Sequence, residues 1–404
     1  MSIAEPGSAA ERLLDSARVL FARHGPDGVS VRQLAAGSGC THALLFRHFG
    51  SKADLERIVV ERLATDLAAA VGHAVATSAD PVRSMLAVAR RNPVETRLLV
   101  RCGLGDLDPS PLTDSPRAAD ALIGSLGPET RSARSTMATR IARFAGLSVL
   151  LGWISFEGFL VAGSRLGPIS ETSRETALAD ATRRIVGLAA DGVTIGRSSR
   201  SRRSVPVASP SPPPHVEEPK DARAALLDAA MTLFALGGSG TVTTRQIALA
   251  AGVNLGLIHR HFGSRAALIS EAINEGTAPL MPAVMAARGF DVDSVVSQVR
   301  HTSLAPRLIA RVLVEGIDIT LVRERFPVQR QLLAAYRAVP RGAGTGDLTD
   351  PRLAVAAGSA LVLGSAIWDR PLRIWAGIDH DVDLDPAITT LTRAIFDLPT
   401  KGPR

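Results

Sequence analysis

Cysteine is almost absent from this 404-residue chain, which contains only Cys40 and Cys102. Two cysteines cannot build a disulfide framework or a cysteine zinc site. Aromatic residues make up 4% of the chain and charged residues 21%, whereas 46% of the residues are hydrophobic. This balance excludes a mostly disordered chain, and at ~100–200 residues per domain the length predicts two to four domains.

Lysine is scarce as well, since only three of the 46 basic residues are lysines. The net charge of +7 therefore reflects an arginine-rich composition as much as a selected basic surface. Five basic and two acidic residues between positions 197 and 220 supply +3 of this charge. The charge permits nucleic-acid binding without establishing it. Residues 1–10 lack the basic and apolar stretches of a secretory signal, so the expected compartment is the cytoplasm.

Motifs of catalysis and metal binding are also missing. The chain has no phosphate-binding glycine loop, no nucleophile elbow and no His-Glu-x-x-His pattern. Its histidines do not have the spacing of a metal site. We therefore expect no enzymatic activity, no cofactor and no metal.

What the chain does contain is an internal repeat. A shift of 213 positions aligns residues 13–55 with residues 226–268 without a gap, and 21 of these 43 positions are identical. This period is far longer than the ~20–50 residues of a solenoid repeat, so it indicates duplication of a whole domain pair. The two copies are joined by a segment rich in arginine and proline, residues 197–220, which is typical of a solvated, semi-extended spacer.

Each copy of the repeat has the pattern of a helix-turn-helix unit. Ser30 and Gln33 form the pattern of a capping box in the first copy, and Thr243 and Gln246 repeat it in the second. Each capping box opens a short helix that ends at a glycine, and a further short helix is expected to follow. Two short helices joined through a glycine turn and packed on a longer first helix make such a unit.

The helix after the turn, expected over residues 42–49 and 255–262, is the one that enters the major groove of DNA. Arg47 and Arg260 have the donor geometry for guanine, Asn254 suits adenine, and the small residues Ala43 and Gly256 allow close approach. A basic residue at the start of the next helix, together with its free amides, predicts a phosphate clamp. The expected DNA-contacting residues are Arg32, Thr41, His42, Ala43, Leu44, Phe46, Arg47, His48 and Lys52 in the first copy, and Arg245, Asn254, Leu255, Gly256, Leu257, His259, Arg260, His261 and Arg265 in the second.

The repeated segment resembles the DNA-binding signature of tetracycline-repressor-like (TetR) regulators. The matching stretches are residues 21–25, 31–35, 39–41 and 45–52, and again residues 234–238, 244–248, 252–254 and 258–265. The resemblance implies an all-α fold in which three N-terminal helices bind DNA, a fourth connects, and a larger helical domain binds an effector and pairs with a partner subunit. The expected domains are a first helix-turn-helix domain at 8–55, a first helical regulatory and dimerisation domain at 56–196, the linker at 197–220, a second helix-turn-helix domain at 221–268 and a second helical domain at 269–400.

The chain departs from the family pattern at one position of each copy. Where the family usually carries a tyrosine that contacts phosphate, this chain has Phe46 and His259. Phenylalanine cannot donate a hydrogen bond, whereas histidine can. Across residues 11–62 there are eight basic and six acidic residues, and across residues 221–275 there are four of each, so the second copy is expected to bind phosphate more weakly.

The later part of each unit contains a long apolar run, residues 144–163 and 353–368. A membrane span is disfavoured because Glu157 lies in the middle of the first run and the second is shorter than ~20 residues. A buried core or interface helix is the better interpretation. In a chain so poor in aromatics, Trp153, Phe156 and Trp368, together with Glu157, are candidates for a pocket that binds a small apolar effector, although simple core packing is the better explanation for each residue taken singly.

These observations favour a transcriptional regulator that binds double-stranded DNA, more specifically a ligand-responsive repressor with two TetR-like units. The two units are expected to act as a covalent pseudo-dimer on an imperfect palindrome, and a homodimer of chains is the other arrangement. The alternative function is a ligand sensor or interaction scaffold. In that case either one head, with the second as the stronger candidate, or both heads no longer bind DNA.

Overall fold

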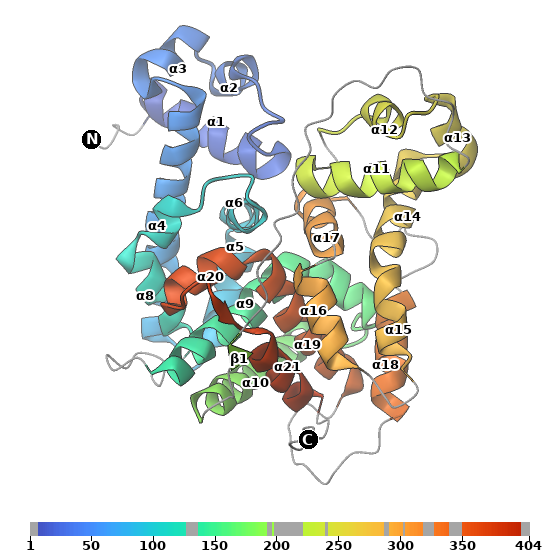
Figure 1. The fold of residues 1–404 in the computed structure, drawn as a ribbon. Helices are drawn as coiled ribbons and strands as arrows, with labels where there is room; N and C mark the ends of the chain where they lie inside the picture. The colour runs from blue at the N-terminus through green and yellow to red at the C-terminus, as the bar shows by residue number, and fades with distance from the viewer. Residues whose placement is uncertain are drawn as a thin grey trace.

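The computed structural model describes residues 7–126, 136–191, 196–197, 221–238, 241–286, 291–301, 304–317, 327–338 and 350–396, and these residues are almost entirely helical (Figure 1). The expected linker lies outside the described residues from position 198 onward. The elements of the first unit are α1 (Ala9–His24), α2 (Val31–Ser38), α3 (His42–Phe49), α4 (Lys52–Thr77), α5 (Pro81–Arg91), α6 (Pro93–Leu104), α7 (Ser110–Thr113), α8 (Pro116–Gly124), α9 (Met137–Gly163), α10 (Glu171–Ala190) and β1 (Gly196–Arg197).

The second unit repeats this order with several changes. Its elements are α11 (Ala222–Gly237), α12 (Thr244–Ala250), α13 (Gly256–Phe262), α14 (Arg265–Thr277), η2 (Ala278–Leu280), α15 (Met281–Val284), α16 (Val292–His301), α17 (Ala305–Val314), α18 (Pro327–Ala338), α19 (Pro351–Ile367), α20 (Asp369–Ala376), β2 (Val382–Asp383) and α21 (Asp385–Ile395). The two strands form a two-residue antiparallel pair that joins the end of the first unit to the second. The all-α fold expected from the sequence is confirmed.

Local sequence signals explain where many helices begin. Proline occupies the first turn of α5, α6, α8 and α19, where its missing N–H costs nothing because the first amides of a helix have no partner within it. Ser8 caps α1 by accepting a hydrogen bond from the amide of Glu11 at 3.2 Å, and Asp221 caps α11 by accepting from the amide of Ala224 at 2.9 Å.

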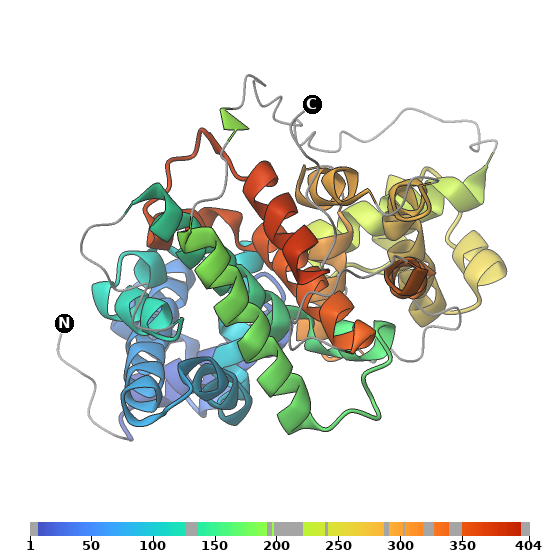
Figure 2. The same cartoon turned by 90° about the horizontal axis from the view of Figure 1, so that it is seen from below.

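The centre of the molecule is the crossing of α9 and α19, one helix from each unit. A Cβ on Gly152 would lie 2.0 Å from the carbonyl oxygen of Ala360, and a Cβ on Gly364 would lie 2.0 Å from that of Ser148. Only glycine permits this approach of two backbones. Figure 2 shows α19 (orange-red) beside α10 (green) on the side of the molecule away from the heads.

The contacts at this crossing have the reciprocal character of a two-fold interface. Gly152 of the first unit meets Gly364 of the second. Gly152 also lies against Ala360, four positions before Gly364, and Gly364 lies against Ser148, four positions before Gly152. These reciprocal contacts relate α9 to α19 by a shift of 212 positions, so Gly152 meets its own equivalent, Gly364. Beside them, the indole Nε1 of Trp368 donates to the hydroxyl of Ser155 at 3.1 Å. A residue can meet its own equivalent only near a two-fold axis, so a pseudo-two-fold axis passes through this interface.

The two units differ most along this axis. In the first unit α9 runs unbroken for 27 residues, whereas in the second the chain bends by 90° at Trp368 between α19 and α20. By length and composition α9 could cross a membrane, as could α19 and α20 taken as one bent pair. Of the most apolar window of α9, 78% is buried, and α9 packs against α10, α19 and α20. This is the environment of a core helix in a folded helical domain.

Candidate nucleic-acid interface

The capping boxes expected at the start of the second helix of each head are present. The hydroxyl of Ser30 accepts from the amide of Gln33 at 3.3 Å, and the amide of Ser30 donates to the side chain of Gln33 at 2.8 Å. Thr243 and Gln246 make the same pair of bonds at 3.2 and 2.7 Å. These reciprocal bonds fix the starts of α2 and α12, which precede the two recognition helices, α3 and α13.

A left-handed glycine ends the second helix of each head. Gly39 and Gly252 both have φ of +66°, a conformation that side chains other than glycine rarely adopt. The chain then turns into α3 and α13. Leu45 of α3 and Ile258 and Phe262 of α13 are buried, so each recognition helix is anchored by its inner face.

The opposite face of each recognition helix is exposed. Phe46 is 49% exposed on α3, and Leu255 is 47% exposed just before α13. Of the residues expected to contact DNA, only Leu44, Leu257, Lys52 and Arg265 are partly covered. The exposed members are Arg32, Thr41, His42, Ala43, Phe46, Arg47 and His48 in the first head, and Arg245, Asn254, Leu255, Gly256, His259, Arg260 and His261 in the second.

Three of the expected contact residues also have structural roles. The side-chain oxygen of Asn254 accepts from the amide of Gly256 at 2.8 Å, which caps the start of α13. The ammonium of Lys52 donates to the carbonyl of Pro26 at 2.7 Å, and Nη2 of Arg265 donates to the carbonyl of Val242 at 2.5 Å. Burial lowers the pKa of Arg265 from its ordinary value. Lys52 and Arg265 therefore tie the fourth helix of each head to the segment between its first two helices.

The two reading segments carry the same charge. Residues 30–51 and 243–264 contain no aspartate or glutamate, and each segment contains two arginines and two histidines. The acidic residues that make the second head neutral overall lie on other helices. The expectation that the second head binds phosphate more weakly rests on those distant charges, and the reading segments themselves give no reason for it.

The two heads lie on the same side of the molecule (Figure 1). Helices α1–α3 and α11–α13 form two separate lobes above a shared helical body, and the paired central helices α9 and α19 lie beneath both. A symmetric dimer of single-headed subunits presents its two recognition helices in this manner. Here a single chain supplies both.

None of the four residues suggested for effector binding lines the apolar cavity of the second unit that is described below. Trp153 and Phe156 are 3% and 0% exposed within the core. Trp368 is fully buried, stacks on Trp375 with ring centroids 6.4 Å apart, and packs against Gly103 of α6. Its position is that of a packing residue at the unit interface.

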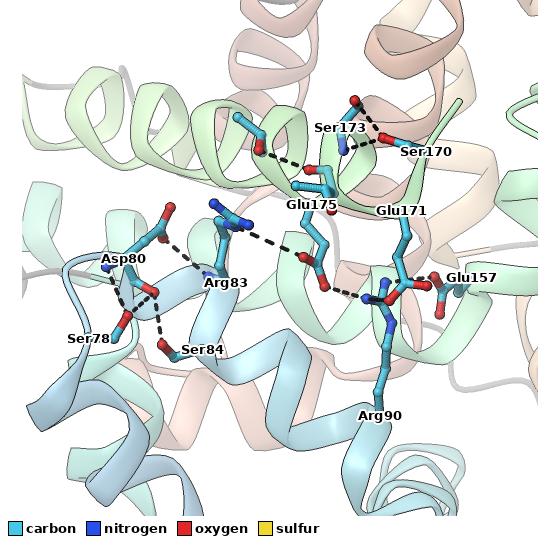
Figure 3. Close-up of polar contacts among 12 residues, drawn as sticks. Ser78, Asp80, Arg83, Ser84, Arg90, Glu157, Ser170, Glu171, Ser173 and Glu175 are labelled. Atoms are coloured by element: carbon cyan, nitrogen blue, oxygen red, sulfur yellow. Dashed lines mark hydrogen bonds and ion pairs between the residues drawn. The ribbon is translucent and has the colours of Figure 1, made fainter. Parts of the chain in front are cut away.

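Glu157 lies on the outer side of α9 within a network of ion pairs (Figure 3). Its carboxylate is 3.2 Å from Nη2 of Arg90, and Glu171 and Glu175 of α10 pair with the same guanidinium. Glu175 also lies 3.9 Å from Arg83. This network fastens α5 to α9 and α10 at the surface of the first unit.

An apolar cavity of about 50 Å³ lies instead within the body of the second unit. Helices α16–α19 form most of its wall, and Phe159 of α9 contributes from the first unit. Ala305 and Ile309 place one face of α17 against it, and Gln329 supplies a polar group. The residues that line this site are scattered over seven α-helices and the short helix η2 and share no motif, so the sequence does not indicate it.

The fold and the two exposed recognition helices define a protein with two helix-turn-helix heads. Comparison with protein families agrees, since the model described as "Bacterial regulatory proteins, tetR family" matches twice, at residues 13–57 and 226–272. The chain belongs to the TetR family, and it is a helix-turn-helix transcriptional regulator.

Curated relatives carry names of the same kind. The chain is 34% identical over 168 residues to the HTH-type transcriptional repressor Rv3405c of Mycobacterium tuberculosis and to the HTH-type transcriptional regulator Mb3439c of Mycobacterium bovis. Each alignment covers 40% of this chain and 80% of the relative. A shorter match, 38% over 58 residues, links it to the HTH-type transcriptional repressor AcnR of Corynebacterium glutamicum and covers 14% of this chain and 31% of that protein. One unit of this chain thus has the dimensions of a whole relative.

Proposed function

We propose that this chain is a cytoplasmic repressor that occupies one operator as a covalent pseudo-dimer. The observation that carries this proposal is the reciprocal packing of α9 on α19, which gives one chain the interface that a two-fold dimer makes between two chains. The two heads then read the two half-sites of a single operator.

The operator of such a protein is an imperfect palindrome, because the two recognition helices present different side chains. Arg47 and Arg260 occupy equivalent exposed positions and suit guanine in both half-sites. Their neighbours differ, with His42 and Phe46 in one head opposite Leu255 and His259 in the other. The half-sites should therefore share a guanine contact and differ beside it.

The proposed effector is an uncharged, largely apolar molecule that binds in the cavity of the second unit. The cavity is smaller than the roughly 300–1,000 Å³ of a typical ligand site. A ligand must therefore displace a wall to enter, and α17 is one of the walls. Such a displacement is the differential interaction by which a ligand can favour a state of lower DNA affinity. No catalytic step or cofactor is part of this function.

Substitution of the two arginines tests the proposed DNA contacts. In Arg47→Ala and in Arg260→Ala we expect binding to weaken by about 1–3 kcal/mol, with base preference relaxed only in the half-site read by the altered head. Arg183→Ala removes the same charge from an exposed position on α10 and should leave both affinity and preference unchanged. Quantitative footprinting on operators with each half-site randomised in turn measures both effects.

The same experiment decides between the proposal and the scaffold alternative. If Arg260→Ala changes neither affinity nor preference, the second head does not read DNA and the pseudo-dimer is refuted. If both substitutions are without effect, the heads have another role. The exposed Phe46, which cannot donate to phosphate, is the feature that favours this alternative.

A further inference from the structure

A cluster of buried charges lies where the two units meet beneath the heads. Arg101 of α6 and Arg311 of α17 are 1% and 4% exposed, and the side chain of Asp106 is 8% exposed. Nη1 of Arg101 lies 2.8 Å from Oδ2 of Asp106, and Nη2 of Arg311 lies 2.5 Å from Oδ1 of the same carboxylate. A carboxylate of the first unit thus pairs with one arginine from each unit. We call these three residues the Asp106 clamp.

Each arginine of the Asp106 clamp also holds the end of the first helix of one head. Nε and Nη2 of Arg101 donate to the carbonyl oxygens of Ala22 and Arg23, at 3.0 Å each. Arg311 donates at 2.8 Å to each of the two carbonyls at the equivalent positions of α11. The last carbonyls of a helix have no partner within it, so these bonds dock α1 and α11 onto the body. A continuous path of hydrogen bonds and ion pairs therefore runs from one head through Asp106 to the other.

Backbone geometry makes room for this path. Gly25 and Gly238 end α1 and α11 with φ of +71° and +82°. A Cβ on Gly25 would lie 2.9 Å from Nη1 of Arg101, and a Cβ on Gly238 would lie 2.5 Å from a carboxylate oxygen of Glu315. Glycine is required at both positions by the left-handed conformation and by the close approach.

The turn after α6 directs Asp106 into the cluster. Gly105 has φ of +79°, its amide donates to the carbonyl of Cys102, and the amide of Asp106 donates back to the carbonyl of Arg101 at 2.9 Å. This pair of bonds ends α6 and brings Asp106 next to Arg101. The second unit makes the same turn at Gly316, but the residue that follows is Ile317. Asp106 therefore has no carboxylate counterpart at the equivalent position of the second unit.

Stability alone does not account for such a cluster. Burial lowers the pKa of Arg101, an effect that the nearby carboxylates of Asp106 and Glu315 oppose. Desolvation of buried ion pairs often cancels their attraction, so they seldom add net stability compared with apolar packing. What the cluster does supply is a fixed geometry between α1 and α11. The neighbouring Arg307 adds a further link, since it donates to the carbonyl of Leu104 in the first unit.

We propose that the Asp106 clamp sets the distance and orientation between the two heads and thereby the half-site spacing that the protein accepts. The part of this inference that concerns DNA rests on the proposed function, whereas the part that concerns head geometry does not. Helix α17 carries Arg311 and also lines the apolar cavity through Ala305 and Ile309. A ligand that displaces α17 therefore acts on both heads through one residue.

Distance measurement between the heads tests the clamp without DNA. Asp15 on α1 and Asp228 on α11 are exposed and equivalent in the repeat, so both can be changed to cysteine and spin-labelled in a Cys40→Ser background. Cys102 is buried and has its pKa raised by burial, which keeps it unreactive. We expect a single narrow distance distribution in the parent protein and a broadened or shifted one in Asp106→Asn.

Two further variants separate the clamp from a general loss of stability. Arg311→Lys keeps the buried charge, but its single ammonium nitrogen cannot occupy both positions from which Nε and Nη2 of the planar guanidinium reach two carbonyls and the carboxylate. It should therefore broaden the distribution even if Asp106→Asn does not fold. Asp385→Asn removes a carboxylate from another buried arginine, Arg300, within the second body, and should leave the distribution unchanged. If Arg311→Lys folds and gives the same distribution of distances between the heads as the parent, the proposal is overturned.

Operators with altered spacing provide the second readout. Each inserted base pair moves one half-site by about 3.4 Å and rotates it by about 35°, so two inserted base pairs should weaken binding of the parent by at least about tenfold. In Asp106→Asn or Arg311→Lys we expect the two inserted base pairs to weaken binding by less than about threefold, because each head can then move to its own half-site independently of the other. An unchanged penalty in both variants contradicts the clamp. If the parent protein itself does not bind DNA, the proposed function is refuted, and the distance measurement alone then tests the clamp.

Discussion

The two heads of the chain share their local structure closely, whereas the two bodies beneath them have diverged. Both heads have a capping box, a left-handed glycine at φ +66° and a basic residue that ties the fourth helix to the loop between the first two helices. The bodies differ in helix continuity, since the unbroken α9 corresponds to α19 and α20 joined at a 90° bend. The cavity lies in the second body, with one wall from the first.

This contrast shows what covalent fusion allows. In a homodimer, any substitution near the two-fold axis appears on both sides, so two large side chains would collide there. In this chain Trp368 donates to Ser155 across the interface, whereas the residues at the equivalent positions, Phe156 and Ile367, have no side-chain hydrogen-bonding group and cannot repeat this bond on the other side of the axis. A fused pair can therefore specialise its interface, whereas each head still has to fit the same major groove.

The largest predicted effect comes from removing the large side chain that the second unit places at the interface. Trp368→Ser should destabilise the protein by about 3–5 kcal/mol because it empties the space against Gly103 and Trp375. Chemical denaturation measures this loss. Ser155→Ala removes only the hydrogen bond to the indole and should cost about 1 kcal/mol. If Trp368→Ser is as stable as the parent, the contacts of Trp368 at the interface contribute nothing to the free energy of unfolding.

A smaller effect tests the likeness of the heads. Ser30→Ala and Thr243→Ala each remove one side of a capping box and should destabilise α2 or α12 by about 1 kcal/mol, equally in both heads. Hydrogen exchange of the amides in these helices measures the change locally. Thr41→Ala is a suitable control because Thr41 makes no side-chain hydrogen bond to α3. Clearly unequal losses would show that one head has relaxed its structure.

The heads could be predicted from the sequence because their determinants are local. The capping boxes join residues three positions apart, and the terminal glycines follow directly from the backbone conformation they must adopt. The recognition helices were expected at 42–49 and 255–262, and they are found at His42–Phe49 and Gly256–Phe262.

The bodies could not be predicted in the same detail because their determinants are distant in sequence. Asp106 meets Arg311 across 205 positions, and Trp368 meets Ser155 across 213. The tryptophans suggested an effector pocket by their rarity alone, but Trp368 is a packing residue and the cavity is lined by Phe159 and ordinary aliphatic side chains. The part of the clamp that is visible in the sequence is Arg101 followed by Gly105 and Asp106, a pattern that suits a helix end but does not reveal that the arginine and the aspartate are buried.

The mass of the protein–DNA complex decides whether one chain occupies one operator. Native mass spectrometry or light scattering on a footprinted operator, with the chain at 42.4 kDa, counts the chains bound. We expect one chain for each operator, with both half-sites protected. Two chains on each operator, with one head of each in contact with DNA, would contradict it.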